Sequence, residues 1–220
     1  MNRLTCKRIE CDEIWSFVGM KGRNVPAELK GVLGDTWTAI DADTKLVPCW
    51  HVGTRAIESA RPFIQDLAGR LTNHGRTQSL SDGCRRSVRE WHWLRAANQD
   101  LWQRRTNQGR CAALQPGRMH RNRKNRITGN PDMENVSTSY VERQNLTMRM
   151  HMRRFTRLTN AFSRKLENHM HAISLYFMFY NFCKIHKSLR VTPAMEAGIT
   201  DHVWELEEVI MMSDTNSPIL

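Results

Sequence analysis

The chain has no apolar run long enough to cross a membrane, and its first residues, MNRLTCKRIE, lack the apolar stretch of a secretion signal. We therefore expect a cytoplasmic protein with no membrane partner. The six cysteines are scattered, and only Cys6 and Cys11 lie close together. A single C-x4-C pair with no second pair is a weak zinc signal, so we interpret the cysteines as buried or surface thiols.

Acidic residues are in short supply. The 33 Lys and Arg outnumber the 22 Asp and Glu and give a net charge of +11, which favours a polyanionic partner, nucleic acid above all. The excess is uneven, because residues 84–122 contain nine Arg, no Lys and two acids. That segment carries +7 and the rest of the chain +4. Most of the basic character therefore depends on one segment.

Hydrophobic residues make up 40% of the 220 residues, enough for one domain with a substantial core. Apolar periodicity and turn residues predict mixed α/β structure. The expected elements are a strand within 11–20, two strands within 35–53 joined by a turn at Asp41–Lys45, a helix at 56–71, a strand at 77–83, helices at 137–155 and 162–182, and a short helix within 190–199. In the 162–182 helix, Leu166, Met170, Ile173, Phe177 and Tyr180 are expected to form the buried face.

Three acids fall where the pattern places strand or helix ends. Asp12 lies on the first strand, Asp82 ends the short strand, and Glu142 lies early on a later helix. Carboxylates that converge repel one another unless cations neutralise them, and a pair of Mg²⁺ ions that clamp a phosphodiester is a common solution. From spacing alone, however, each acid could equally be a surface turn or helix-start residue, because intervals of 70 and 60 residues are not diagnostic.

Four segments carry a resemblance to a known family: CDEIWSFVG, TAIDADTKLVP, STSYVERQNLTMRMHMRRFTRLTNAFSRKLENH and YNFCKIHKSLRVTPAMEAGI. They resemble DDE transposases of the insertion-sequence-one (InsB-like) kind over about 1–83 and 123–212. The resemblance places the family's three acids on Asp12, Asp82 and Glu142. It implies an RNase H-like mixed sheet flanked by helices in a catalytic domain at 1–212, followed by a tail at 213–220.

The same resemblance implies a chemistry and partners. Asp12, Asp82 and Glu142 would be the catalytic residues and the ligands of a two-metal site for Mg²⁺ or Mn²⁺. The reaction would be cleavage and strand transfer of the ends of a mobile element. The partners would be transposon-end and target DNA, with a homo-oligomer as the active form, in the bacterial cytoplasm at the nucleoid.

Three other acids, Glu13, Asp41 and Asp43, are competing candidates for these positions. Glu13 follows Asp12 and should point to the opposite face of the sheet, so we prefer Asp12. Asp41 and Asp43 lie at the expected hairpin turn, where Asp commonly bonds to the local backbone. We expect both to be structural.

Basic and amide side chains follow Glu142 along its expected helix. Asn145, Arg149 and Arg153 recur at intervals of three and four residues, on one helical face. Together with Arg143 they would grip phosphates beside a metal site, and we expect them to contact DNA. The alternative is an ordinary solvated basic face.

Residues 84–122 depart from the family. One choice of codons for residues 112–122, read one base later, gives LRYSPAECIG, which resembles the family's sequence at this place. We interpret 84–122 as the product of a frameshift after Gly83, restored near Arg123, and expect an irregular segment there. Asp82 and Glu142 survive, but the chain between them is altered, so we expect a decayed copy with little or no strand transfer.

Long family members carry a zinc and helix-turn-helix region before the first strand, and none precedes Met1 here. We therefore expect weak, non-specific, salt-dependent DNA binding. Two other functions stay open: a non-catalytic DNA-binding remnant that inhibits an intact transposase through mixed oligomers, and a metal nuclease without strand transfer.

Overall fold

The computed structural model describes residues 1–16, 18–19, 35–54, 57–72, 77–80, 137–156 and 159–215. The expected catalytic Asp82, the altered segment 84–122 and the last five residues of the expected tail lie outside these ranges. No helix in the described part of the chain is long and apolar enough to cross a membrane.

The described strands form one four-stranded mixed sheet in the order β3-β2-β1-β4. The strands are β1 (Ile9–Trp15), β2 (Asp35–Asp41), β3 (Trp50–Gly53) and β4 (Thr77–Leu80). β2 pairs antiparallel with both β1 and β3, whereas β4 pairs parallel with β1. The first strand is shorter than the expected 11–20 and begins two residues earlier.

The turn between β2 and β3 is held by the side chains that the sequence assigns to structure. Asp41 accepts hydrogen bonds from the hydroxyl (2.8 Å) and the backbone N–H (3.4 Å) of Thr44, and Asp43 forms an ion pair with Arg8. Asp41 therefore bonds within the turn, whereas Asp43 ties the turn to Arg8, and both acids make structural contacts.

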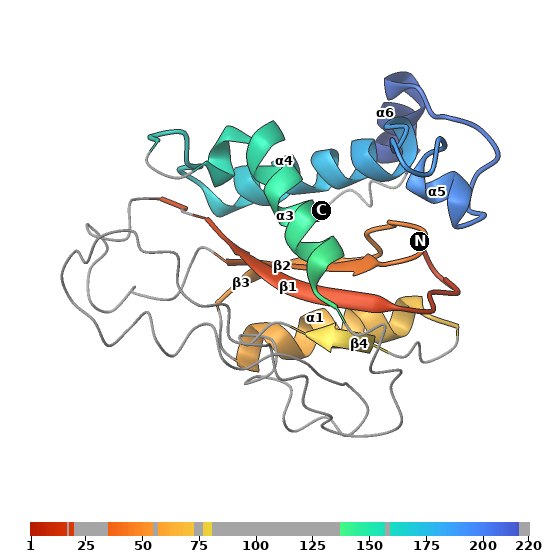
Figure 1. Cartoon of the computed structure of the whole chain (residues 1–220). Helices are drawn as coiled ribbons and strands as arrows, with labels where there is room; N and C mark the ends of the chain where they lie inside the picture. Colours follow the sequence, from red (N-terminus) through yellow and green to blue (C-terminus); the bar gives the residue numbers. More distant parts are fainter. Residues whose placement is uncertain are drawn as a thin grey trace, which may run out of the picture.

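Helices cover both faces of the sheet (Figure 1). On one face lies α1 (Ile57–Arg70), and on the other lie α3 (Ser139–His151) and α4 (Leu166–Met178). Strand alternation separates the two cores. Cys11 and Trp37 pack with Phe63 and the rest of the α1 cluster, while Ile14 packs with residues of α3 and α4.

Two long helices differ from their expected bounds. The helix expected at 137–155 ends at His151, and Arg153–Phe155 form a separate 3-10 turn, η3, after Met152 adopts an extended conformation. The helix expected at 162–182 begins at Leu166 and continues after Met178 as a π-helical segment, η4 (Phe179–Cys183).

The buried face of α4 also differs from the expected one. Met170 is 39% exposed, whereas the neighbouring His169 is completely buried. The expected spacing therefore selects the wrong neighbour at this turn, because His169 finds polar partners in the core. Ile173, Phe177 and Tyr180 are buried as expected.

The C-terminal helices complete this layer: α5 (Pro193–Glu196) and α6 (Leu206–Thr215). Thr192 caps α5 by accepting a hydrogen bond from the Met195 N–H (3.2 Å), and Pro193 opens the helix. Asn181 bonds both the N–H and the carbonyl of Val47, at 3.0 and 2.9 Å. Thr192 and Asn181 therefore make structural contacts.

Candidate functional site

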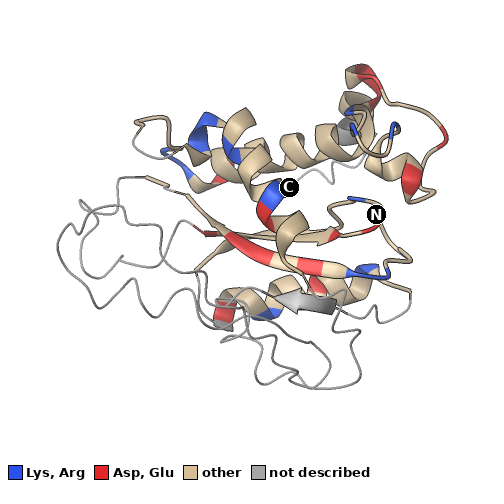
Figure 2. Cartoon of the chain, in the orientation of Figure 1, with Lys and Arg blue, Asp and Glu red and all other residues tan. Residues whose placement is uncertain are grey.

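Asp12 lies in the middle of β1, at the centre of the sheet and on the face that α3 covers. The antiparallel register places Thr38 of β2 opposite it. The alternation of side chains along β1 gives Asp12 the same face as Glu10 and Ile14 and sends Glu13 to the other face, as expected. Figure 2 shows acidic residues along this strand.

Asn145 fixes the carboxylate of Asp12. Its amide Nδ2 donates a 2.7 Å hydrogen bond to Asp12 Oδ2, and its amide Oδ1 accepts one of 3.2 Å from Thr38 Oγ1. Asn145 is only 5% exposed. In this structure the Asn145 amide is bonded to Asp12 and Thr38, and the expected DNA contact at Asn145 stays a prediction. The bond to Asn145 restrains the Asp12 carboxylate.

Glu10 anchors the start of the same helix. Its Oε2 accepts hydrogen bonds from the backbone N–H groups of Tyr140 (2.9 Å) and Val141 (3.0 Å). The side chain is 3% exposed, and burial raises the pKa of the Glu10 carboxyl while the two backbone bonds oppose that rise. A carboxylate at this position satisfies N–H groups that lack partners within the helix and faces the positive end of the helix dipole.

Hydroxyl residues at the start of α3 supply only part of its cap. Ser137 Oγ accepts a 3.0 Å hydrogen bond from the Ser139 N–H. The N-cap Thr138, however, makes no side-chain bond to the backbone and instead donates to Glu142 Oε1 at 2.7 Å. Glu10, which caps the next two N–H groups, lies about 130 residues away and gives no local signal in the sequence.

The two contacts between β1 and α3 have matching spacings along the strand and along the helix. Glu10 and Asp12 lie two residues apart on a strand, a rise of about 7 Å, and their partners Val141 and Asn145 lie four residues apart on a helix, a rise of about 6 Å. The first turns of α3 are therefore held against β1 by consecutive carboxylates on one face of the strand. This double contact sets the position and rotation of α3.

Glu142 lies in the first turn of α3 and is exposed. It precedes Asn145 by three residues, so it lies one turn away along the same side of the helix. Asn145 contacts Asp12, while the Glu142 carboxylate accepts a hydrogen bond from Thr138. The structure thus places two of the three expected acids on elements that are in direct contact.

The structure describes β4, the strand that precedes the third expected acid, Asp82. β4 is parallel to β1, with Glu10 paired to Ser79 and Cys11 to Leu80. The strand that leads toward Asp82 therefore runs beside the strand that carries Asp12, in the same direction. Asp82 itself lies outside the described residues. Among those that the structure does describe, no group of three or more His, Cys, Asp or Glu could hold a metal ion.

The expected DNA-contacting arginines do not form one continuous face. Arg149 follows Asn145 by four residues on α3 and is half-buried, while Arg143 is exposed. Arg153 lies beyond the end of α3, on η3. The expectation that Arg153 extends the α-helical face is therefore wrong, because the break at Met152 ends the helical period.

His169 belongs to the core. Its ring lies within hydrogen-bond distance of Ser16 Oγ (3.0 Å, from Nε2) and Ser163 Oγ (3.4 Å, from Nδ1). Burial, and to a lesser degree the charge of Arg154, lower the pKa of His169 to about 4. The imidazole is therefore neutral at pH 7 and links the end of β1 to the start of α4.

The described cysteines are thiols rather than disulfides, and Cys6, Cys11 and Cys49 are buried. Burial raises the pKa of the Cys6 thiol to about 12 and that of Cys11 further still. Protonated thiols in an apolar core are inert, so these cysteines contribute to packing.

Comparison with protein-family models, with curated proteins and with solved structures found no match to this chain. The resemblance to insertion-sequence transposases stays a prediction from the sequence.

Proposed function

We propose that this chain is a DDE-type transposase catalytic domain with an RNase H-like fold, which cuts and joins DNA phosphodiesters at a two-metal site. The observation that carries the proposal is the hydrogen bond from Asn145 to Asp12. It joins the strand that bears one expected ligand to the helix that bears another, Glu142. The mixed sheet with helices on both faces supports the fold assignment.

The donor set fits Mg²⁺ or Mn²⁺. Both ions prefer carboxylate oxygens, and Asp12 and Glu142 supply them from two rigid elements. Asp12 is only partly buried and Glu142 is exposed, so DNA can reach both. Glu10, by contrast, is buried with its carboxylate committed to the start of α3, and we exclude it from the ligand set. Asp82 would be the third ligand, delivered from the strand beside β1.

Each residue has a distinct task in this proposal. A bound metal pair would activate water or a 3′-OH and stabilise the leaving oxygen. Asp12, Asp82 and Glu142 hold the metal. Asn145 keeps the Asp12 carboxylate in one orientation, and Arg143, Arg149 and Arg153 contact the phosphates of the DNA partner as a homo-oligomer assembles on it.

Mn²⁺ binding tests the metal site directly. Electron paramagnetic resonance titrations would compare the wild-type chain with Asp12→Asn and Glu142→Gln. Because each change removes a charged ligand, we expect Mn²⁺ affinity to fall at least about tenfold in both variants. Glu58→Gln is the matched control: Glu58 is also an exposed acid in the first turn of a helix, but α1 lies on the other face of the sheet. Unchanged Mn²⁺ affinity in both site variants would contradict the proposal.

Strand transfer on pre-cut element ends tests the reaction. We expect little or none from this chain, and recovery when a family-like sequence replaces 84–122, because misplaced ligands can cost about a hundredfold in rate. Asp12→Asn in the repaired chain should abolish it again. If the chain binds DNA but neither binds metal nor cleaves, it would be the non-catalytic DNA-binding remnant. If it cleaves DNA without joining it, it would be a metal nuclease.

A further inference from the structure

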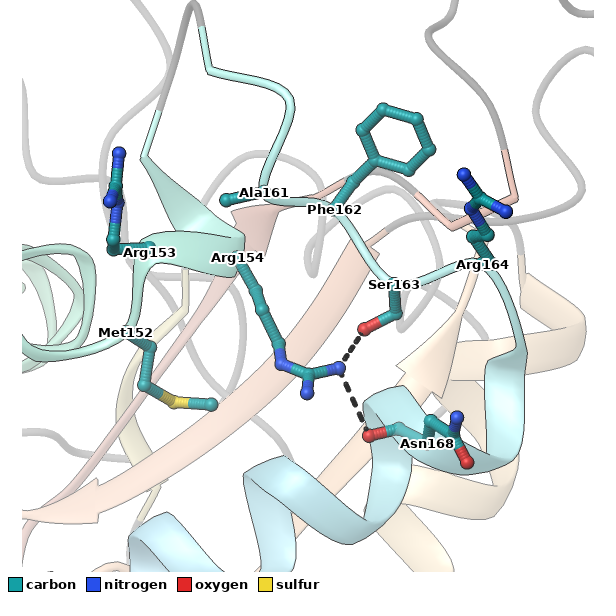
Figure 3. Close-up of a pocket in the computed structure, with 8 residues that line it drawn as sticks. All are labelled: Met152, Arg153, Arg154, Ala161, Phe162, Ser163, Arg164 and Asn168. Carbon is teal, nitrogen blue, oxygen red and sulfur yellow. Dashed lines mark hydrogen bonds between the residues drawn. The ribbon is translucent and has the colours of Figure 1, made fainter.

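A basic pocket lies beyond the C-terminal end of α3, away from the acidic site. It has a volume of about 520 Å³ and is lined by residues of η3, of the segment that leads into α4, and of the first turn of α4. Figure 3 shows the lining residues: Met152, Arg153, Arg154, Ala161, Phe162, Ser163, Arg164 and Asn168. Three of them are arginines and none is acidic.

Arg154 is built into this pocket. Its Nη1 donates to Ser163 Oγ and, at 3.2 Å, to the backbone carbonyl of Asn168 (Figure 3). Ser163 is buried and is itself bonded to the buried His169. Within the described part of the chain, both hydrogen bonds of Arg154 use Nη1, which leaves its Nη2 and Nε donors for a ligand. A guanidinium held in this way is pre-organised for phosphate, which it binds through a planar fork of donors.

The surroundings of the pocket are positively charged. Between Glu142 and Glu167 the sequence has no acid, and its basic residues there are Arg143, Arg149, Arg153, Arg154, Arg157, Arg164 and Lys165. Figure 2 shows basic residues gathered around η3 and the start of α4. Arg153 and Arg164 are exposed. An anionic ligand would therefore meet two exposed arginines, Arg153 and Arg164, and one arginine held by hydrogen bonds, Arg154.

Phe162 adds an apolar surface to this charged site. Its side chain is half-buried, lines the pocket, and stands at its edge near Arg164 in Figure 3. An aromatic ring beside phosphate-binding arginines is the combination that holds unpaired nucleotides, since the bases stack on rings and the backbone follows the positive charge. A simple inorganic anion would make no use of the ring.

We propose that this pocket binds an unpaired nucleic-acid strand, with different phosphates of the strand on Arg154 and Arg164, whose side chains point in opposite directions in Figure 3, and one base on Phe162. The idea rests on the proposed nucleic-acid partner, although it does not depend on the metal site. The nine residue steps from Glu142 to His151, the end of α3, span about 14 Å, which corresponds to about four stacked nucleotides at about 3.4 Å each. One strand can therefore reach both the acidic site and the pocket.

Binding of a fluorescein-labelled oligothymidylate to the full chain, measured by fluorescence anisotropy without divalent metal across a salt series, tests this proposal. For Arg164→Ala we expect weaker binding and a salt slope reduced by about 0.7, the value for one phosphate contact on a single strand. For Phe162→Ala we expect affinity to fall about fivefold to a hundredfold with the slope unchanged. Phe162→Trp should keep the affinity close to that of the wild type, because bases also stack on tryptophan.

Arg61→Ala is the control. Arg61 is exposed on α1, across the sheet, so the change removes the same charge elsewhere. We expect its oligothymidylate affinity and salt slope to match the wild type, and thermal unfolding to be unchanged in all four variants. If Arg164→Ala and Phe162→Ala bind oligothymidylate as Arg61→Ala does, the pocket proposal is wrong while the nucleic-acid partner stands. If the wild-type chain binds neither oligothymidylate nor duplex DNA, the proposed partner is wrong as well.

Discussion

The two faces of the sheet are built in different ways. On the α1 face, Cys11 and Trp37 pack against Phe63, Ile64 and Leu67, and each of these side chains is at most 1% exposed. On the α3 face, apolar packing is interrupted by polar groups that make defined bonds: Glu10 to the start of α3, Asp12 to Asn145, and Thr38 to the same amide.

This difference favours α3, rather than α1, as the helix of the proposed site. Apolar burial is strong but non-directional, so it can hold α1 against the sheet without fixing the orientation of any one side chain. Hydrogen bonds to carboxylates have narrow distances and angles, so they fix α3 in position and rotation. Glu142 and Asp12 therefore lie on the face where geometry is set by directional bonds.

Truncation of the apolar face should have the largest effect on stability. Phe63 is 1% exposed and its ring centroid lies 6.0 Å from that of Trp37. Phe63→Ala should lower the free energy of unfolding by about 3–5 kcal/mol, because it removes buried area and leaves a cavity. Urea denaturation measures this, with Phe63→Leu as a milder control. A loss below about 1 kcal/mol would mean that this face is not the main source of stability.

Acid should weaken the polar face through His169. The folded protein holds the pKa of His169 at about 4, below its ordinary 6.5, through burial and the charge of Arg154. The unfolded chain therefore takes up the proton first, and stability falls as the pH falls from 6.5 to 4, by up to about 3 kcal/mol.

Urea denaturation across this pH range checks the prediction for His169. His169→Gln should be less stable than the wild type at pH 7 and should lose most of this pH dependence, whereas Phe63→Ala should retain it. The same acid sensitivity in His169→Gln and in the wild type would assign the effect to other groups.

Removal of the Asn145 amide should show whether this residue affects metal binding independently of stability. Asn145→Ala removes a bond to a charged group and leaves Asp12 and Thr38 without this partner, so we expect a loss of about 2–3 kcal/mol. Gln144→Ala is the matched control, since Gln144 is also buried on α3 but bonds Tyr176 (3.4 Å) rather than Asp12. Only Asn145→Ala should weaken Mn²⁺ binding; an equal effect of both changes would mean that α3 acts through stability alone.

The cap supplied by Glu10 should have the smallest effect of these four. Glu10→Ala leaves the N–H groups of Tyr140 and Val141 without their acceptor, and we expect a loss of about 1–2 kcal/mol at pH 7. Glu10→Gln keeps one acceptor oxygen and avoids burying a charge, so it should cost less than Glu10→Ala. Thermal unfolding of both variants measures the difference. A larger loss in Glu10→Gln would mean that the charge, rather than the acceptor, holds α3.

Local sequence patterns identify most of the described helices and strands, because these patterns depend only on residues that are close together in the sequence. Alternation predicts β1 and the opposite facing of Asp12 and Glu13, and the apolar stripe predicts α1. The same patterns fail where a distant partner decides the outcome. Helix α3 ends early at His151, and the core accepts His169 instead of Met170 because Ser16 and Ser163 satisfy its ring.

The sequence alone determined which residues could perform chemistry and on which local elements they lie. It assigned Asp12 to a strand and Glu142 to the start of a helix, and the resemblance attached a function to them. Only the tertiary structure decided what holds these residues together. Glu10 and Asn145 show why: their partners lie about 130 residues away, and a hydrogen bond between distant segments leaves no periodic signal in either one.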